Sequence, residues 1–364
     1  MSHEITIRNS GTVEMAYVGE KPWHGLGQEL TVGAPIENWI ASAGMDWKIQ
    51  RSVVRYVTDR PEAGQATMYR KMPDTHVLFR SDSKAPLGVV SDKYEIVQPQ
   101  AVLEFFRDLT ESAGFQLDTA GTLFGGRRFW ALAKTGESQA IGDAADKVAG
   151  YLLLSSSCDG TAATEGRYTT VRVVCNNTLS AARRMGAKVR VTHRSVFNPG
   201  EVKKELGIDV AHDRFAETMD DMRRLADTRV SDIDMLKQTA ELFHPGASQL
   251  AKKELVKILE SKPVARVAEL AIDGKAIGSN FSGVRGAQWG WLNAVTQYVD
   301  HEARARSADN RLNSAWFGKG DALKNKAYEM AMDAADGTRT MVQVQQAEVA
   351  SNDFARLLGK PLTV

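Results

Sequence analysis

The chain has 364 residues, of which 43% are hydrophobic and 25% are charged, and its formal net charge is +1. This length allows two or three domains with cores of their own, and the balanced charge excludes a protein that attracts polyanions through its overall field. No apolar run approaches the ~20 residues of a membrane span, and the N-terminus lacks the apolar core of a secretory signal, so we expect a cytoplasmic protein without membrane contact. Its two cysteines, Cys158 and Cys175, are too few for a disulfide framework or a four-thiolate zinc site.

The first hundred residues predict loops, a short helix and several strands. A loop rich in glycine surrounds His24, and a short helix follows that carries Trp39 and ends at Gly44. Between residues 47 and 97, strand-like runs alternate with turn-rich pieces, which predicts an antiparallel meander. Pro99 then suits the first turn of a helix.

A predicted hairpin follows at residues 121–134. Two glycines in succession between apolar runs favour a tight turn, because both positions can take a positive φ. Trp130 alternates with cations along the second strand, and an arginine, an aromatic ring and a lysine on one sheet face suit a platform on which bases stack. The alternative is that Trp130 packs inward and the cations fringe an edge strand. The residues in question are Arg127, Arg128, Trp130 and Lys134.

Residues 148–184 predict the centre of the fold. They contain two strands, a polar loop that carries Asp159, and a predicted helix that starts near Thr178. Arg172 stands in mid-strand, opposite the apolar side chains. Since a helix N-terminus with nearby arginines can hold a phosphate, we expect one anion-binding surface made by Arg172, Arg183, Arg184 and Arg190.

Residues 183–204 form the one clearly basic stretch of the chain. A charge run is usually a solvated face, but a local excess in a neutral chain also suits contact with nucleic acid. Lys188 and Arg194 belong to this stretch, and Tyr168 on the preceding strand is a further candidate for base stacking.

Beyond residue 207 the pattern is that of amphipathic helices with charged outer faces. The sequence therefore predicts an α+β fold. We expect an α+β domain with an antiparallel sheet and packed helices over residues 1–205, and a mostly helical region over 206–364.

Several motifs resemble one known family. GEKPWHGLG, GTLFGGRRFWALAK, the DGT loop with VRVVCNNTLSAA, NAVTQYVDH and WFGKGDALKNKA resemble, in this order, the phage/plasmid-like protein family known as domain of unknown function 932. The resemblance implies a resident of phages, plasmids or integrative elements, and it carries no established biochemistry. The family pattern has a histidine before the Asp-Gly pair where this chain has Cys158.

Three classes of function remain open. The first is a single-stranded nucleic-acid-binding protein, with DNA as the expected partner, no cofactor and no metal. Its outline is similar to phage strand-annealing proteins, which implies a homo-oligomer with a ring as the expected form. The second is a metal-dependent nuclease or hydrolase that uses Asp159, His24, Cys158 and Asp118. The third is a non-catalytic anti-defence or interaction protein. Because Asp-Gly is a strong turn former, we expect a structural role for Asp159.

Overall fold

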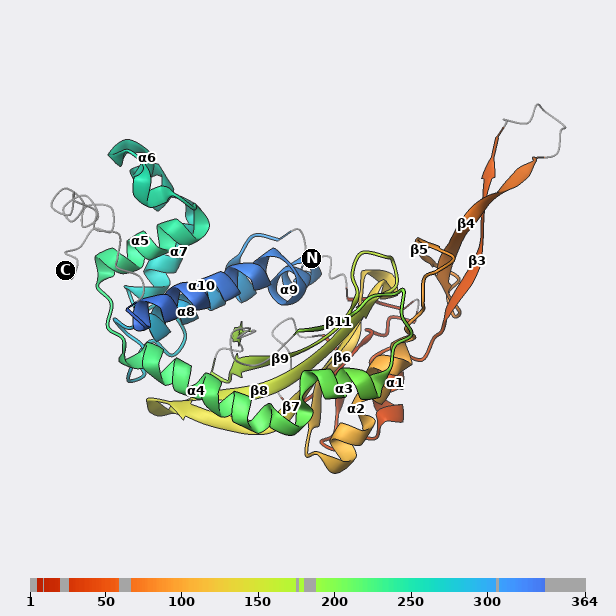
Figure 1. Ribbon diagram of the computed structural model, residues 1–364, viewed down its shortest axis with the longest axis horizontal. Helices are drawn as coiled ribbons and strands as arrows, with labels where there is room; N and C mark the ends of the chain where they lie inside the picture. The colour runs from red at the N-terminus through yellow and green to blue at the C-terminus, as the bar shows by residue number, and fades with distance from the viewer. Residues whose placement is uncertain are drawn as a thin grey trace.

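The structure is a computed structural model that describes residues 5–8, 10–19, 26–58, 67–174, 177–179, 188–305 and 308–337. It confirms the predicted α+β class, with two sheets and helices packed around the larger one (Figure 1). The last strand ends at Val191, and every regular element described after it is helical. The division between residues 205 and 206 stays a prediction, because one cluster of buried apolar side chains extends from Ala16 to Met332.

The larger sheet has eight strands in the order β10-β9-β8-β7-β6-β1-β2, with β11 paired to β9. Strands β1 and β2 are parallel, and the other pairs are antiparallel. The strands are β1 (Met15–Val18), β2 (Gln28–Leu30), β6 (Gln116–Leu123), β7 (Arg128–Ile141), β8 (Asp143–Ser157), β9 (Thr164–Arg172), β10 (Asn177–Leu179) and β11 (Val189–Val191).

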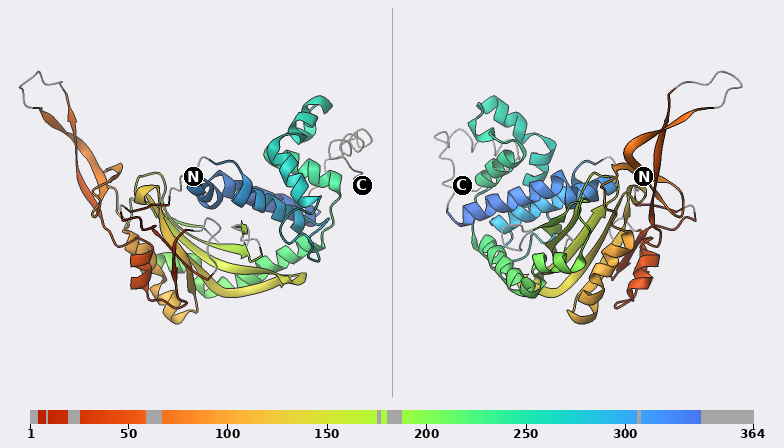
Figure 2. Two further views of the ribbon diagram at one scale, coloured as in Figure 1. Left: turned by 180° about the vertical axis from the view of Figure 1, so that it is seen from behind. Right: turned by 45° about the vertical axis from the view of Figure 1, so that its right-hand side comes forward.

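The smaller sheet confirms the predicted meander. Its three antiparallel strands are β3 (Ile49–Val57), β4 (Tyr69–Arg80) and β5 (Pro86–Ser91). Strands β3 and β4 extend well beyond β5 and project from the body of the molecule as a two-stranded ribbon (Figures 1 and 2).

Helices cover both faces of the larger sheet. On one face lie α2 (Pro99–Ser112), α3 (Pro199–Leu206) and α4 (Ala211–Asp227). The opposite face contacts the end of α9 (Ala308–Phe317) and the start of α10 (Lys319–Ala335). The remaining helices are α1 (Ile36–Ser42), α5 (Asp232–Phe243), α6 (Lys252–Leu259), α7 (Lys262–Ala271) and α8 (Gln288–Gln297), and single turns lie at Phe124–Gly126, Ile208–Val210, Ala247–Gln249 and Tyr298–Glu302.

The predicted hairpin at residues 121–134 is confirmed as the β6–β7 connection. Both of its glycines take left-handed backbone angles, with φ of 72° at Gly125 and 93° at Gly126. A side chain at Gly126 would also come within 2.6 Å of the Trp47 ring. The turn thus requires glycine for its conformation and for its close contact with the small sheet.

The predicted helix at Thr178 is wrong. Residues Asn177–Leu179 form the short strand β10, which pairs antiparallel with Thr170–Arg172 of β9. Two consecutive asparagines favour a reversal of the chain as well as a helix cap, and the exposed edge of β9 supplies hydrogen bonds that favour the strand. Among residues that the structure describes, a phosphate site on a helix N-terminus is therefore absent at this position.

Candidate nucleic-acid interface

Three segments that are distant in sequence meet at one end of the larger sheet. The β6–β7 hairpin places Arg128 opposite Ser157, the last residue of β8. The amide of Cys158 donates to the carbonyl of Arg127 at 2.9 Å. On the far edge of β9, Arg190 of β11 lies opposite Glu165. Since neighbouring strands are ~4.8 Å apart, β7 and β11 are separated by about 15 Å here.

Four of the predicted cations remain accessible at this end of the sheet. Arg127, Arg190 and Arg194 are exposed and make no ion pair with any residue that the structure describes. Lys188 is also exposed, although its Nζ lies 2.6 Å from Glu165 Oε2. We refer to Arg127, Lys188, Arg190 and Arg194 as the sheet-end patch.

Trp130 and Tyr168 cannot form the predicted stacking platform. Trp130 is fully buried, with its ring edge-on to Trp316 of α9 at a centroid distance of 6.2 Å. Tyr168 is 5% exposed and belongs to the core on the opposite face of the sheet. Helices cover both faces of the sheet, so neither ring is available to a ligand, and the expected stacking role of these two side chains is wrong.

Arg172 is a structural residue, which corrects its predicted contact with phosphate. It is 3% exposed, and its Nε and Nη2 lie 2.6 and 2.9 Å from the two carboxylate oxygens of Asp146. Trp289 of α8 also donates to Asp146, at 3.0 Å. Arg172 donates in addition to the carbonyls of Ile277 and Gly278. This guanidinium joins β9 to the segment before α8 and is not accessible to an anion.

The other predicted cations have mixed outcomes. Lys134 Nζ lies 2.7 Å from Asp118 Oδ1. Lys134 stands about six residues along β7 from the sheet-end patch, which corresponds to ~20 Å. Arg183 and Arg184 lie outside the described residues.

Arg128 is half-buried, bonds to Asn313 and stacks over the Phe317 ring at 5.0 Å. Burial lowers the pKa of Arg128, and the negative charges of Asp159 and Glu165 raise it by a smaller amount.

One junction was missed by sequence reasoning. Arg167 of β9 is 6% exposed and pairs with Asp321 of α10 at 2.6 Å. Together with Arg128 and Phe317, this pair joins the hairpin motif to the motif around Gly318-Lys319-Gly320. A charged residue within a strand that is otherwise buried was the available signal, but its partner is 154 residues away in sequence.

The alternative catalytic residues do not come together. Cys158 donates its thiol to the Gly126 carbonyl at 3.3 Å, and burial raises its pKa to about 12, so it is not a nucleophile at neutral pH. Asp159 accepts from the Thr161 amide at 3.0 Å and hydroxyl at 2.6 Å, and Gly160 has a φ of 79°. These contacts give Asp159 the predicted turn-forming role.

Asp118 lies far from that loop, beside Lys134, and burial raises its pKa. His24 lies outside the described residues. Within the described ranges, no three side chains among the histidines, cysteines, aspartates and glutamates converge as a metal site would require. The three of these residues that the structure describes, Asp118, Cys158 and Asp159, therefore do not define one reaction centre.

Comparison with known families gives one match. The family model described as "Domain of unknown function (DUF932)" matches residues 86–316, which is more than half of the chain. This range includes both hairpin strands, the β8–β9 loop, β11 and nearly all of α9. The comparisons with curated proteins and with solved structures gave no match. Of the helices that are described, none combines the length and apolar character needed to cross a bilayer.

Proposed function

We propose that this chain, which belongs to the DUF932 family, is a single-stranded nucleic-acid-binding protein whose contact surface is the sheet-end patch. The observation that carries the proposal is the convergence of Arg127, Lys188, Arg190 and Arg194 from the hairpin and from the β11 region. Three of these four cations have no carboxylate partner among the described residues. Unpaired cations grouped on a neutral protein provide a local attraction for a polyanion.

The geometry suits a flexible strand. The patch spans about 15–20 Å, which corresponds to several nucleotides. Its cations come from separate loops and strand ends and do not line a single groove. Because Trp130 is buried, the groups proposed to stack on bases are others that lie beside the patch. Phe124, half-buried at the hairpin turn, and the guanidinium of Arg127 offer flat surfaces for a base.

The proposed role of this binding is strand annealing in the recombination of phage or plasmid DNA in the cytoplasm. Annealing requires a protein that holds a strand by its backbone and leaves the base edges accessible. A patch of four cations binds weakly at physiological salt, so a homo-oligomer that lines up several patches would supply the affinity.

The test is a salt titration of binding to a fluorescent single-stranded oligonucleotide. The sheet-end variant carries Arg127→Ala, Arg190→Ala and Arg194→Ala. Each lost phosphate contact should reduce the slope of log affinity against log salt by about 0.7, so the slope should fall by about 2. The control variant removes three exposed lysines from α6 and α7, which lie away from the patch (Figure 1): Lys253→Ala, Lys257→Ala and Lys262→Ala.

The control variant should bind with nearly the wild-type slope. Both variants should keep the wild-type thermal stability, since exposed charges rarely contribute more than about 0.5 kcal/mol. An unchanged slope in the sheet-end variant would contradict the proposal. So would a wild-type protein with no salt-dependent affinity for a single strand, which would favour a protein partner.

A further inference from the structure

The ribbon formed by β3 and β4 projects from the body, and none of the described helices covers it (Figures 1 and 2). Strand β5 pairs with β4 only over Thr75–Phe79. Farther out, the ribbon has two strands, and we refer to residues 54–58 and 67–73 as the distal ribbon. Every side chain described in it is exposed except that of Val54, which is half-buried.

The distal ribbon exposes large apolar and aromatic side chains. The exposed fractions are 48% for Tyr56, 44% for Val57, 66% for Met68, 62% for Tyr69 and 43% for Met72. An isolated two-stranded ribbon is marginally stable in water, and exposed groups of this size in one segment indicate a binding surface.

The charge of the distal ribbon has one sign. Arg55, Arg70 and Lys71 are exposed and make no ion pair with any described residue. No aspartate or glutamate occurs in residues 54–58 or 67–73, and the acids that directly follow these two ranges in sequence are Asp59 and Asp74. The complementary partner is therefore a polyanion. A second copy of the same ribbon is disfavoured, because lysines and arginines on edge strands repel an identical edge.

Cations and tyrosines occupy both faces of the distal ribbon. Cross-strand pairs place Arg55 opposite Lys71, Tyr56 opposite Arg70, and Val57 opposite Tyr69. Because successive pairs point to opposite faces, Arg55, Lys71 and Tyr69 share one face and Tyr56 and Arg70 the other. A flat partner would contact a single face, whereas the groove of a duplex presents phosphates along both of its walls.

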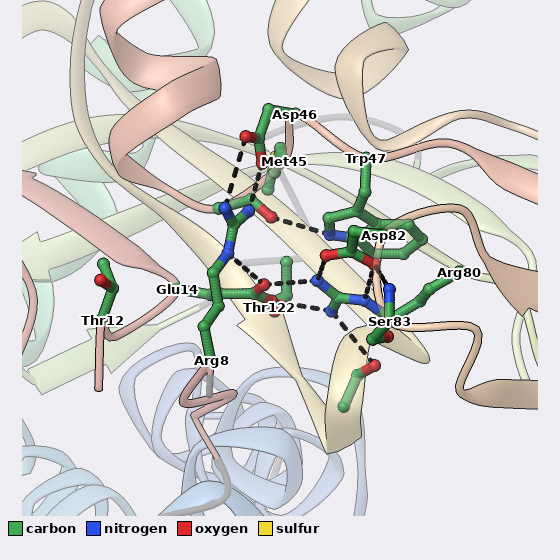
Figure 3. A network of polar contacts seen from close by, with 12 residues as sticks. Arg8, Thr12, Glu14, Met45, Asp46, Trp47, Arg80, Asp82, Ser83 and Thr122 are labelled. Carbon is green, nitrogen blue, oxygen red and sulfur yellow. Dashed lines mark hydrogen bonds and ion pairs between the residues drawn. The ribbon is translucent and has the colours of Figure 1, made fainter. Parts of the chain in front are cut away.

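The base of the ribbon is fixed by an ion cluster around the buried pair Arg80 and Glu14 (Figure 3). Arg80, at the end of β4, bonds Glu14 at 2.5 and 3.0 Å and Asp82 at 2.8 and 3.0 Å. Its guanidinium also stacks on the Trp47 ring at 4.1 Å. Glu14 is fully buried and accepts from Arg8 as well. This clamp joins the small sheet to the larger one, so the ribbon is held at its root.

We propose that the distal ribbon is an arm that lies in a groove of double-stranded nucleic acid. A two-stranded β-ribbon fits the major groove, which is about 12 Å wide in B-form DNA. Arg55, Arg70 and Lys71 meet the phosphates on the two walls, while Tyr56 and Tyr69 pack against sugars and base edges. The proposal concerns a different surface and a different nucleic-acid form from the sheet-end patch, and it does not depend on that patch.

The experiment is a salt titration with a 30-base-pair DNA duplex. The ribbon variant carries Arg55→Ala, Arg70→Ala and Lys71→Ala, and the lysine control variant defined above is its match for charge. Each lost duplex contact should reduce the slope of log affinity against log salt by about 0.9, so we expect a reduction of about 2.7. A second variant, Tyr56→Ala with Tyr69→Ala, should weaken binding and leave the slope unchanged.

Thermal melting and the mass in solution are measured for each variant. Because the substituted side chains are exposed, the ribbon variant should melt with the wild type and keep its mass. A ribbon variant whose duplex affinity and slope equal those of the control would overturn the proposal. A change of oligomeric state with duplex binding intact would also overturn it, since the ribbon would then contact a second copy of the chain.

Discussion

Arginines on two strands of this protein have opposite environments. Arg172 of β9 is buried against Asp146, whereas Arg55 of β3 is exposed and makes no ion pair with a described residue. Both stand among apolar strand residues in the sequence. The difference is that β9 lies inside a sheet covered on both faces, whereas no described helix or strand packs on either face of the distal ribbon. Availability for a ligand is decided by what packs on the strand, and the strand pattern itself does not contain that information.

The largest effect expected from this comparison is on stability. Arg172→Ala leaves the Asp146 carboxylate buried without its main partner, which should cost about 3–5 kcal/mol in the free energy of unfolding. Arg190→Ala, at an exposed position, should cost less than about 0.5 kcal/mol. Urea unfolding of the two variants measures the difference. A stable Arg172→Ala protein with a flatter salt slope would show that Arg172 contacts phosphate after all.

Cys158 extends the comparison to reactivity. In a Cys175→Ser background it is the only thiol, and a pKa raised to about 12 by burial leaves about a thousandfold less thiolate at pH 8 than an ordinary cysteine has. Labelling by a disulfide reagent should be slower by at least that factor in the native protein than in urea. Fast labelling of the native state would contradict the assigned burial.

The same pKa makes a prediction for stability. A thiol whose pKa is raised on folding stabilises the protein fully below the unfolded pKa of about 8.5, and this contribution is lost as pH rises toward about 12. Unfolding free energies measured between pH 7 and pH 10 should therefore fall less in a Cys158→Ala protein than in its parent. An identical pH dependence in both would contradict the prediction.

Asp159→Asn should have a smaller effect. Asparagine keeps a side-chain oxygen that can accept from the Thr161 amide, so the turn should persist and stability should change by less than about 1 kcal/mol. Binding of single strands should stay close to wild type. A specific loss of function with the fold intact would revive a catalytic role for this loop.

Local patterns predicted local structure. The paired glycines at 125 and 126 predicted a hairpin because the ability to take a positive φ, which a tight turn requires, is a property of glycine itself. The helix predicted at Thr178 failed because the competing partner, β9, is a tertiary contact. Exposure was the least predictable property: Trp130 is covered by Trp316, and Arg167 is paired with Asp321, both from the far C-terminal part.

The distal ribbon was not singled out from sequence for the same reason. Arg55, Arg70 and Lys71 lie in ordinary strand patterns, and what distinguishes them is the absence of any layer against the distal ribbon in the described structure. The sheet-end patch was partly predictable, since Lys188, Arg190 and Arg194 belong to one basic stretch, but its junction with Arg127 depends on strand pairing.

The most direct test is to measure both variants with both forms of nucleic acid. Salt slopes are measured for the sheet-end variant and the ribbon variant, each with a single strand and with a duplex. We predict that the sheet-end variant flattens the single-strand slope by about 2 with little effect on the duplex, and that the ribbon variant flattens the duplex slope by about 2.7 with little effect on the single strand. Slopes that change equally in both variants for both substrates, or in neither, would contradict the assignment of two separate nucleic-acid surfaces.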